Sequence, residues 1–184
     1  RGPGKTAGTS GAGIYVMSGA PKNNITIRNG IVRDWRGNGI SALNSVNSGF
    51  EGLQCFNNGA DGLIAGSYSV VLNNTCRDNG EEGISTGTSA SITGNVCSYN
   101  GQNGIYAGTN STLIGNTCTN NTVNGLRGAY CTIINNTCNY NSTHGIAGAS
   151  YCTITGNTCF FNSRDGTALQ SGCRVANNTC CMNG

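Results

Sequence analysis

A cysteine that recurs at nearly constant spacing constrains the fold of this chain more than any other feature. From the first member to the last, the spacings are 21, 21, 21, 20, 21 and 21 residues. The column comprises Cys55, Cys76, Cys97, Cys118, Cys138, Cys159 and Cys180. A fixed period near 21 indicates one structural unit that is copied and stacked, so that each copy buries its apolar face against its neighbours.

Each period contains short runs of alternating apolar and polar residues, separated by Gly and Asn, which is typical of strands and turns. Three strands per period fit a flattened or triangular coil. Aligning the periods gives three inward walls, and the cysteine column is one of them. The other two are Ile40, Leu63, Ile84, Ile105, Leu126 and Ile146, and Val71, Ile92, Leu113, Ile133, Ile154 and Val175. Stacked like residues pack closely, so the sequence predicts an all-β solenoid.

The amino-terminal part follows the same pattern more loosely. Residues 25–32 align with the second and third strands and place Val32 in the cysteine column. A larger coil containing Pro21 opens near Gly13, and residues 1–12 are expected to form an extended lead-in. We therefore predict one solenoid domain over residues 13–184, with seven to eight coils of about 21 residues. The chain starts at Arg1, which we interpret as a sign of an excised piece.

Columns of Asn flank the cysteines, two residues before most of them and three residues after each. Asn tolerates the left-handed backbone of tight turns, and stacked carboxamides can hydrogen-bond along the stack. We therefore expect the Asn columns at the corners of the coil, with a structural role.

Most of the cysteines are predicted to be buried free thiols. Neighbouring strands lie about 4.8 Å apart, whereas a disulfide prefers Cβ atoms about 3.8 Å apart. The last three coils add a second cysteine seven residues earlier, which leaves an alternative open. The bridges would then be Cys131–Cys138, Cys152–Cys159 and Cys173–Cys180.

These repeats resemble those of right-handed parallel β-helix proteins in the pectate-lyase-like superfamily, within its generic secreted repeat group. The resemblance lies in the copies G-I-x-x-G, S/C-x-I-x-x-N-T-C-x-x-N and covers residues 25–184. It implies a right-handed, single-stranded parallel β-helix. It leaves activity open, because the same coil serves polysaccharide lyases, glycosidases, epimerases, tailspikes and adhesins.

Composition limits the classes of binding partner and the cellular compartment that are expected for this chain. Charged residues make up 9% of the chain and the net charge is +3, so neither nucleic acid nor membrane insertion is expected. Low charge and several Asn-X-Ser/Thr triplets favour an extracellular or cell-surface location. The candidate glycosylation sites are Asn24, Asn73, Asn110, Asn120, Asn135, Asn141 and Asn177.

Candidate catalytic groups lie in the column that precedes each coil-opening Gly. Asp61 and Glu82 occupy neighbouring coils there, at a spacing near that of the carboxyl groups in retaining glycosidases. His144 and Asp165 form a second neighbouring pair, suited to a general base. We expect this turn to face solvent and its carboxylates to keep an ordinary pKa.

A calcium site is a further alternative, and its ligands would be Asp61, Asp78, Glu81 and Glu82. No other cofactor is expected. A single His and inward thiols argue against a transition-metal site.

A glycan-binding face is the other candidate site. The outward column next to the inward Ile/Leu wall contains Tyr106 and Arg127, which suit stacking and hydrogen bonding to a saccharide. A second outward column contains Tyr68, Tyr130 and Tyr151. By resemblance, the first of these faces is where such proteins often meet sugars.

The sequence therefore predicts a non-catalytic extracellular structural or adhesive β-solenoid that contacts glycans. Neither end shows an amphipathic cap, which leaves two alternatives: the chain was cut from something longer, or copies stack end to end into a fibre. The alternative is a polysaccharide-degrading enzyme, lyase or glycosidase, or a fragment of a tailspike-like protein.

Overall fold

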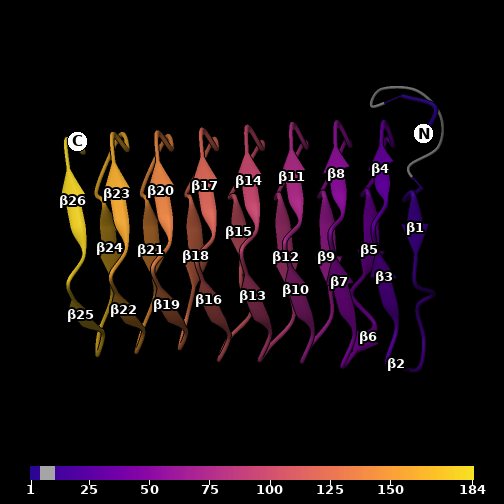
Figure 1. Ribbon diagram of the computed structural model, residues 1–184, viewed down its shortest axis with the longest axis horizontal. Coiled ribbons are helices and arrows are strands. Elements are labelled where there is room, and N and C mark those ends of the chain that lie inside the picture. The colour runs from indigo at the N-terminus through magenta and orange to yellow at the C-terminus, as the bar shows by residue number, and fades with distance from the viewer. Residues whose placement is uncertain (5–10) are drawn as a thin grey trace.

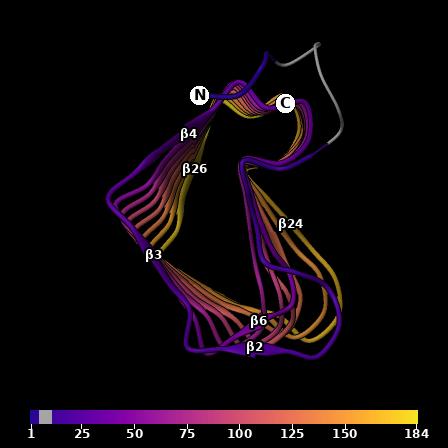
Figure 2. The ribbon, with the colours of Figure 1, turned by 90° about the vertical axis from the view of Figure 1, so that its right-hand side faces the viewer.

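The computed structural model describes residues 1–4 and 11–184, and the described chain winds into eight stacked coils (Figure 1). Each coil contributes one short strand to each of three parallel sheets, as the sequence predicts. Viewed along the axis, the coils superimpose and enclose a three-sided interior (Figure 2). The expected lead-in over residues 1–12 falls partly on residues 5–10, which lie outside the described residues. The first strand begins at Ile14.

Sheet 1 contains the strand that opens each coil. Its members are β1 (Ile14–Tyr15), β5 (Ile40–Ala42), β9 (Leu63–Ala65), β12 (Ile84–Thr86), β15 (Ile105–Tyr106), β18 (Leu126–Gly128), β21 (Ile146–Gly148) and β24 (Thr167–Leu169).

Sheet 2 contains the middle strand of each coil. Its members are β3 (Thr26–Arg28), β7 (Gly49–Glu51), β10 (Val70–Leu72), β13 (Ser91–Thr93), β16 (Thr112–Ile114), β19 (Thr132–Ile134), β22 (Thr153–Thr155) and β25 (Arg174–Ala176).

Sheet 3 contains the cysteine column. Its members are β4 (Ile31–Arg33), β8 (Gln54–Phe56), β11 (Thr75–Arg77), β14 (Val96–Ser98), β17 (Thr117–Thr119), β20 (Thr137–Asn139), β23 (Thr158–Phe160) and β26 (Thr179–Cys181). Two further strands, β2 (Lys22–Asn23) and β6 (Ser45–Val46), pair with each other in the first two coils. They account for the larger opening coil that the sequence predicts.

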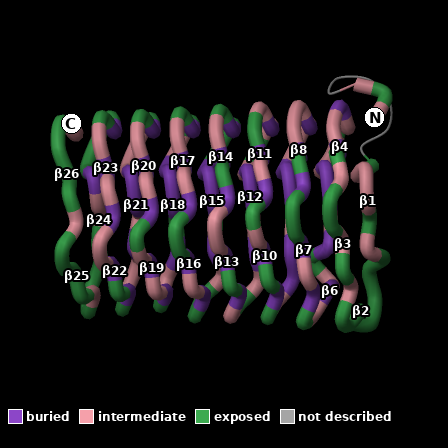
Figure 3. The backbone as a smooth tube through the Cα atoms, in the orientation of Figure 1, coloured by how far each residue is buried: buried purple, intermediate pink, exposed green. Residues whose placement is uncertain are grey.

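The register confirms the three inward walls. Cys76 pairs with Cys55 on one side and Cys97 on the other, and Val32 takes the cysteine position in the first coil. The inward side chains are buried from the second coil to the seventh (Figure 3). In the last of the described coils Val175 and Cys180 are exposed. The core is therefore one continuous column and not a central globule.

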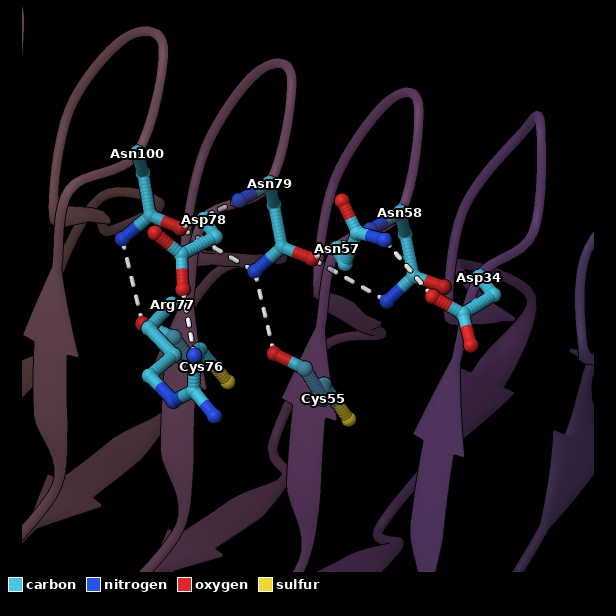
Figure 4. Close-up of polar contacts among 9 residues, drawn as sticks. All are labelled: Asp34, Cys55, Asn57, Asn58, Cys76, Arg77, Asp78, Asn79 and Asn100. Carbon is cyan, nitrogen blue, oxygen red and sulfur yellow. Dashed lines mark hydrogen bonds and ion pairs between the residues drawn. The ribbon is translucent and has the colours of Figure 1, made fainter. Parts of the chain in front are cut away.

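Two ladders of buried Asn stabilise the corners on either side of sheet 3. In the ladder after sheet 3, the backbone N and Nδ2 of Asn79 both donate to Oδ1 of Asn100, and Nδ2 also donates to the Cys55 carbonyl (Figure 4). In the ladder before sheet 3, Asn95 donates in the same way to Asn116. Each carboxamide thus satisfies backbone groups that the turn leaves unpaired, which is the role expected of buried polar side chains.

The ladder asparagines themselves are not left-handed, so that part of the sequence prediction was wrong. The left-handed residue is the one immediately before the ladder Asn, for example Asn57 at φ 55° and Asp78 at φ 57°. The same corner position is occupied elsewhere by Tyr99 and Tyr140. The ladder Asn therefore contributes the hydrogen bonds of its carboxamide, whereas the residue before it adopts the left-handed conformation that the turn requires.

All eleven cysteines are free thiols, so the three alternative bridges do not form. Cys131 and Cys152 lie at the corner between sheets 1 and 2, away from the sheet 3 column, and stack on their own kind. The backbone N of Cys131 lies 3.5 Å from Sγ of Cys152, and that of Cys152 lies 3.3 Å from Sγ of Cys173. These thiols replace the Ser48 and Ser111 hydroxyls of other coils.

Candidate functional site

The outward face of sheet 1 is hollowed over its last coils. Its outward column pairs Tyr106 with Arg127, then Arg127 with Ala147, and Ala147 with Ala168. Because a tyrosine and an arginine are followed by two alanines, the face drops beyond Arg127. A groove of about 360 Å³ lies there, with Arg127, His144, Ala147 and Ala168 among its lining residues.

A second hollow of about 240 Å³ lies on the other side of the same arginine. Its lining includes Tyr106, Thr109 and Arg127. Both hollows share Arg127 and Ala149. The two hollows adjoin at these residues, and their linings extend from Thr88 to Gln170. We call the two together the sheet 1 groove.

Arg127 is the central polar group of the sheet 1 groove. Its guanidinium carbon lies 5.4 Å from the centre of the Tyr106 ring, which is a cation–π contact. Among residues 1–4 and 11–184, no ion pair involves Arg127. The Arg127 guanidinium therefore lines the groove, contacts the Tyr106 ring and has no carboxylate partner among these residues. Such a group suits the binding of an anion.

His144 and Asp165 are brought together, as the sequence predicts. Nδ1 of His144 lies 3.1 Å from Oδ2 of Asp165, although the pair lacks the alignment of a hydrogen bond. His144 lines the groove with Arg127, whereas the Asp165 side chain is 62% exposed. The pair adds a titratable nitrogen to the groove.

The tyrosines at the corner between sheets 1 and 2 stack on one another. The rings of Tyr130 and Tyr151 are 5.4 Å apart and nearly parallel. The far side of the Tyr151 ring is covered by Gly172, where a Cβ would lie 2.4 Å from a ring carbon. Tyr130 and Tyr151 nevertheless remain 52% and 61% exposed, against 40% for Tyr106. Tyr106 differs in that it lines the sheet 1 groove beside Arg127.

Asp61 and Glu82 are adjacent, but their surroundings differ from the sequence expectation. Asp61 is buried, with 7% of its surface exposed, and its Oδ1 accepts a hydrogen bond from the backbone N of Glu82. Burial, together with the nearby Glu82 carboxylate, raises the pKa of Asp61 to about 7. The expectation of a solvent-facing turn with an ordinary pKa was therefore wrong for Asp61.

Asp61 belongs to a third ladder at the corner after sheet 3. Nδ2 of Asn103 donates to Glu82, and Nδ2 of Asn124 donates to Asn103. The carboxylates of Asp61, Glu81 and Glu82 have oxygen atoms within 4.8 Å of one another, whereas Asp78 pairs with Arg77. Calcium at this cluster stays a prediction, as does catalysis by Asp61 and Glu82, which lie outside the sheet 1 groove.

Six of the seven candidate glycosylation sites are exposed and left-handed at outer corners. They are Asn24, Asn73, Asn110, Asn120, Asn135 and Asn177. Asn141 differs, because its side chain is fully buried and its Nδ2 donates to Asn162 and to the Cys118 carbonyl. A glycan on Asn141 is incompatible with this ladder position.

The sequence matches the family described as the right-handed β-helix region over residues 5–123. The chain belongs to the right-handed β-helix family. The family match shows the right-handed winding that the repeat predicts, and the three sheets are parallel, as the repeat also predicts. No curated protein matches the sequence.

Two solved structures share this β-helix fold. The mannuronan C-5 epimerase AlgE4 A-module of Azotobacter vinelandii has a TM-score of 0.64 and 17% identity, over 88% of this chain and 60% of that one. The periplasmic alginate epimerase AlgG has a TM-score of 0.66 and 15% identity, over 92% and 46% of the two chains. The β-helix therefore spans about half of these longer chains.

Sequence reasoning found the charged and aromatic members of the groove but missed its shape. Ala147 and Ala168 stand in the same outward column as Tyr106 and Arg127, and a change from large to small side chains along one column is a readable signal for a hollow. The sequence named His144 as a candidate base but did not place it in the groove, because it lies at the corner and not on the sheet. Only the stacked β-helix brings it beside Arg127.

Proposed function

We propose that this β-helix is an extracellular or periplasmic module that binds an acidic polysaccharide along the sheet 1 groove. The observation that carries the proposal is Arg127, which lies in the middle of the groove against the Tyr106 ring and has no carboxylate partner in the part of the chain that the structure describes. A guanidinium binds a carboxylate through two parallel hydrogen bonds. A uronate sugar supplies such a carboxylate together with a ring that stacks on Tyr106.

The electrostatic setting of the groove supports an anionic ligand. Between residues 83 and 163 the only formally charged side chain is Arg127, with His144 as the only other titratable base. No acidic side chain is among the lining residues of the two hollows, and the nearby Asp165 carboxylate is mostly exposed beside His144, so Arg127 is the formal charge within the groove. Both similar structures bear the names of enzymes that act on mannuronan or alginate, which also favours an acidic sugar and, through AlgG, a periplasmic setting.

A binding role without catalysis is the simpler proposal. The Asp165 carboxylate that would orient His144 is mostly exposed, and its contact with Nδ1 is poorly aligned. End-to-end association of copies stays a prediction from the sequence.

Calorimetric titration with an acidic oligosaccharide tests the proposal. Arg127→Ala should weaken binding at least about tenfold, since a hydrogen bond to a charged group contributes about 1.5–3 kcal/mol. Arg174→Ala is the matched control, because it removes the same charge from an exposed position on sheet 2. A neutral oligosaccharide of equal length should bind weakly to the wild-type chain. Equal losses in the two variants would leave only a general charge effect and contradict the proposal.

An enzyme acting on the same polysaccharide is the second candidate, favoured by His144 in the groove beside Arg127. With the sugar carboxylate held by Arg127, a neutral imidazole can remove the proton next to that carboxylate. Incubation in deuterated water would reveal deuterium in the recovered sugar, or an unsaturated product. Loss of that signal in His144→Gln, with binding retained, would establish catalysis and replace the non-catalytic proposal.

A further inference from the structure

The sheet 1 groove extends over several coils along the solenoid axis. Its linings run from Thr88, which follows β12, to Gln170, which follows β24. Neighbouring coils lie about 4.8 Å apart, and one pyranose unit of an extended glycan is about as long. A glycan that lies along the groove therefore places about one sugar on each coil.

One cation lies within all of these coils. Arg127 is in β18, and the outward residues in register with it in the next two coils are Ala147 and Ala168. The hollow on the side of Tyr106 is lined by uncharged residues apart from Arg127 itself. The groove thus has one position that suits a carboxylate, with uncharged coils on both sides of it.

The floor beyond Arg127 is formed by small residues, and backbone donors beside it are already paired. The backbone N of Ala149 donates to the Gly128 carbonyl, and that of Gln170 donates to the Gly148 carbonyl. A ligand carboxylate over this floor would lose water without gaining an ion pair, which costs free energy.

The imidazole at this floor does not replace a second arginine. His144 lines the hollow, but its Nδ1 lies 3.1 Å from Oδ2 of Asp165. A positive charge on the ring would be shared with this carboxylate of the chain, which also repels a carboxylate of the ligand. An uncharged sugar avoids this cost, and its hydroxyl groups suit the amide of Gln170.

We propose that the sheet 1 groove prefers a glycan in which a uronate stands between uncharged sugars over a chain composed of uronates alone. The inference rests on the binding of an acidic polysaccharide proposed above and specifies the spacing of charge along that ligand. Specificity is a difference between two affinities. Both ligands place one carboxylate on Arg127, but the all-uronate chain also places carboxylates over coils that have no cation.

Two tetrasaccharides of equal length test this preference by calorimetric titration, one of alternating glucuronate and N-acetylglucosamine and one of glucuronate alone. The wild-type chain should bind the alternating ligand at least about tenfold more tightly, because it leaves fewer carboxylates without a partner. Equal affinities, or tighter binding of the all-uronate ligand, would overturn the inference and leave the proposed function standing. Binding of neither ligand would contradict both.

Ala147→Arg supplies the missing cation, since it places an arginine at the position of Arg127 one coil further on. The affinity for the all-uronate ligand should rise at least about tenfold, with little gain for the alternating ligand. Ala176→Arg is the matched control, because it adds the same charge at an exposed position on sheet 2. Equal gains in the two variants would reduce the effect to general charge and contradict the inference. Ala168→Arg, with the same expected gain, is the second variant should Ala147→Arg fail to fold.

Discussion

Coils in residues 11–82 and coils in residues 83–163 have the same backbone arrangement but differ in the charge of their outward side chains. The first region carries Arg28, Arg33, Glu51 and Arg77 on its sheet faces and includes the additional strands β2 and β6. The second region carries one formal charge, Arg127, and its coils repeat more regularly. The inward walls continue through both without interruption. The comparison teaches that corner and core residues specify the coil, which leaves the outward positions free for function.

The largest expected effect comes from breaking an Asn ladder in the regular region. In Asn116→Ala, the backbone N of Asn95 loses its side-chain acceptor and the Ile92 carbonyl loses a donor. Nδ2 of Asn95 loses one of its three acceptors, and Oδ1 of Asn136 loses one of its two donors. Buried groups left unpaired cost about 1–3 kcal/mol each, so a loss of roughly 4 kcal/mol in the free energy of unfolding is expected. Urea titration followed by circular dichroism measures it.

The matched variant in the first region is Asn74→Ala. Oδ1 of Asn74 accepts only from the backbone N of Leu53, because the position before it on the ladder is not an Asn. Asn74→Ala loses three hydrogen bonds and Asn116→Ala loses four, so the loss of stability should be smaller by about 1 kcal/mol. Equal losses would show that the ladder does not act through these hydrogen bonds.

Asp61 replaces an Asn of the third ladder, and its effect depends on pH. Its folded-state pKa of about 7 lies above the ordinary carboxyl value, because of burial and then the nearby Glu82. Between about pH 4 and pH 7 the folded chain keeps a proton that the unfolded chain releases, so stability falls as pH rises through this window and is level above it.

Asp61→Asn, which copies Asn103 and Asn124 of the same column, removes this penalty. The variant should exceed the wild type by on the order of 3 kcal/mol at pH 8, with little difference at pH 4. Thermal unfolding at the two pH values compares them. A gain of the same size at both would contradict the titration of Asp61.

A third test uses the glycine that opens each coil. A Cβ at Gly104 would lie 2.7 Å from the Gly125 carbonyl O and 2.8 Å from Nδ2 of Asn121. Gly104→Ala should therefore cost about 2 kcal/mol, as overpacking does. Gly49→Ala in the first region meets nothing within 4 Å and should leave the denaturation midpoint almost unchanged. A similar cost at both sites would contradict overpacking as its cause.

The smallest expected effect concerns Tyr106, which supports Arg127 from one side. Tyr106→Ala should weaken binding of an acidic oligosaccharide by about 1 kcal/mol, the typical size of a cation–π contact. Tyr151→Ala, at the stacked corner, should not change the affinity measured by calorimetry. The reverse ranking would place the sugar on the tyrosine corner.

Much of this structure was accessible from the sequence because each coil repeats the same physical requirement. Ile105 and Cys97 repeat the residue types found at the same position of neighbouring coils, and a column of like apolar residues is buried only when the coils stack. The environment of Asp61 was not accessible, since one carboxylate among asparagines looks like a surface variation until the ladder is seen. The groove likewise depends on the difference in side-chain size between Ala147 and Arg127. This is a difference between neighbouring coils and not a property of the repeat.

The most direct test of the account is a crystal structure of the β-helix with a bound acidic oligosaccharide. The account predicts the sugar chain in the sheet 1 groove, running along the axis, with a carboxylate on Arg127 and a sugar ring near Tyr106. A sugar bound at the Tyr130 and Tyr151 corner, or on the outward faces of sheets 2 and 3, would contradict it.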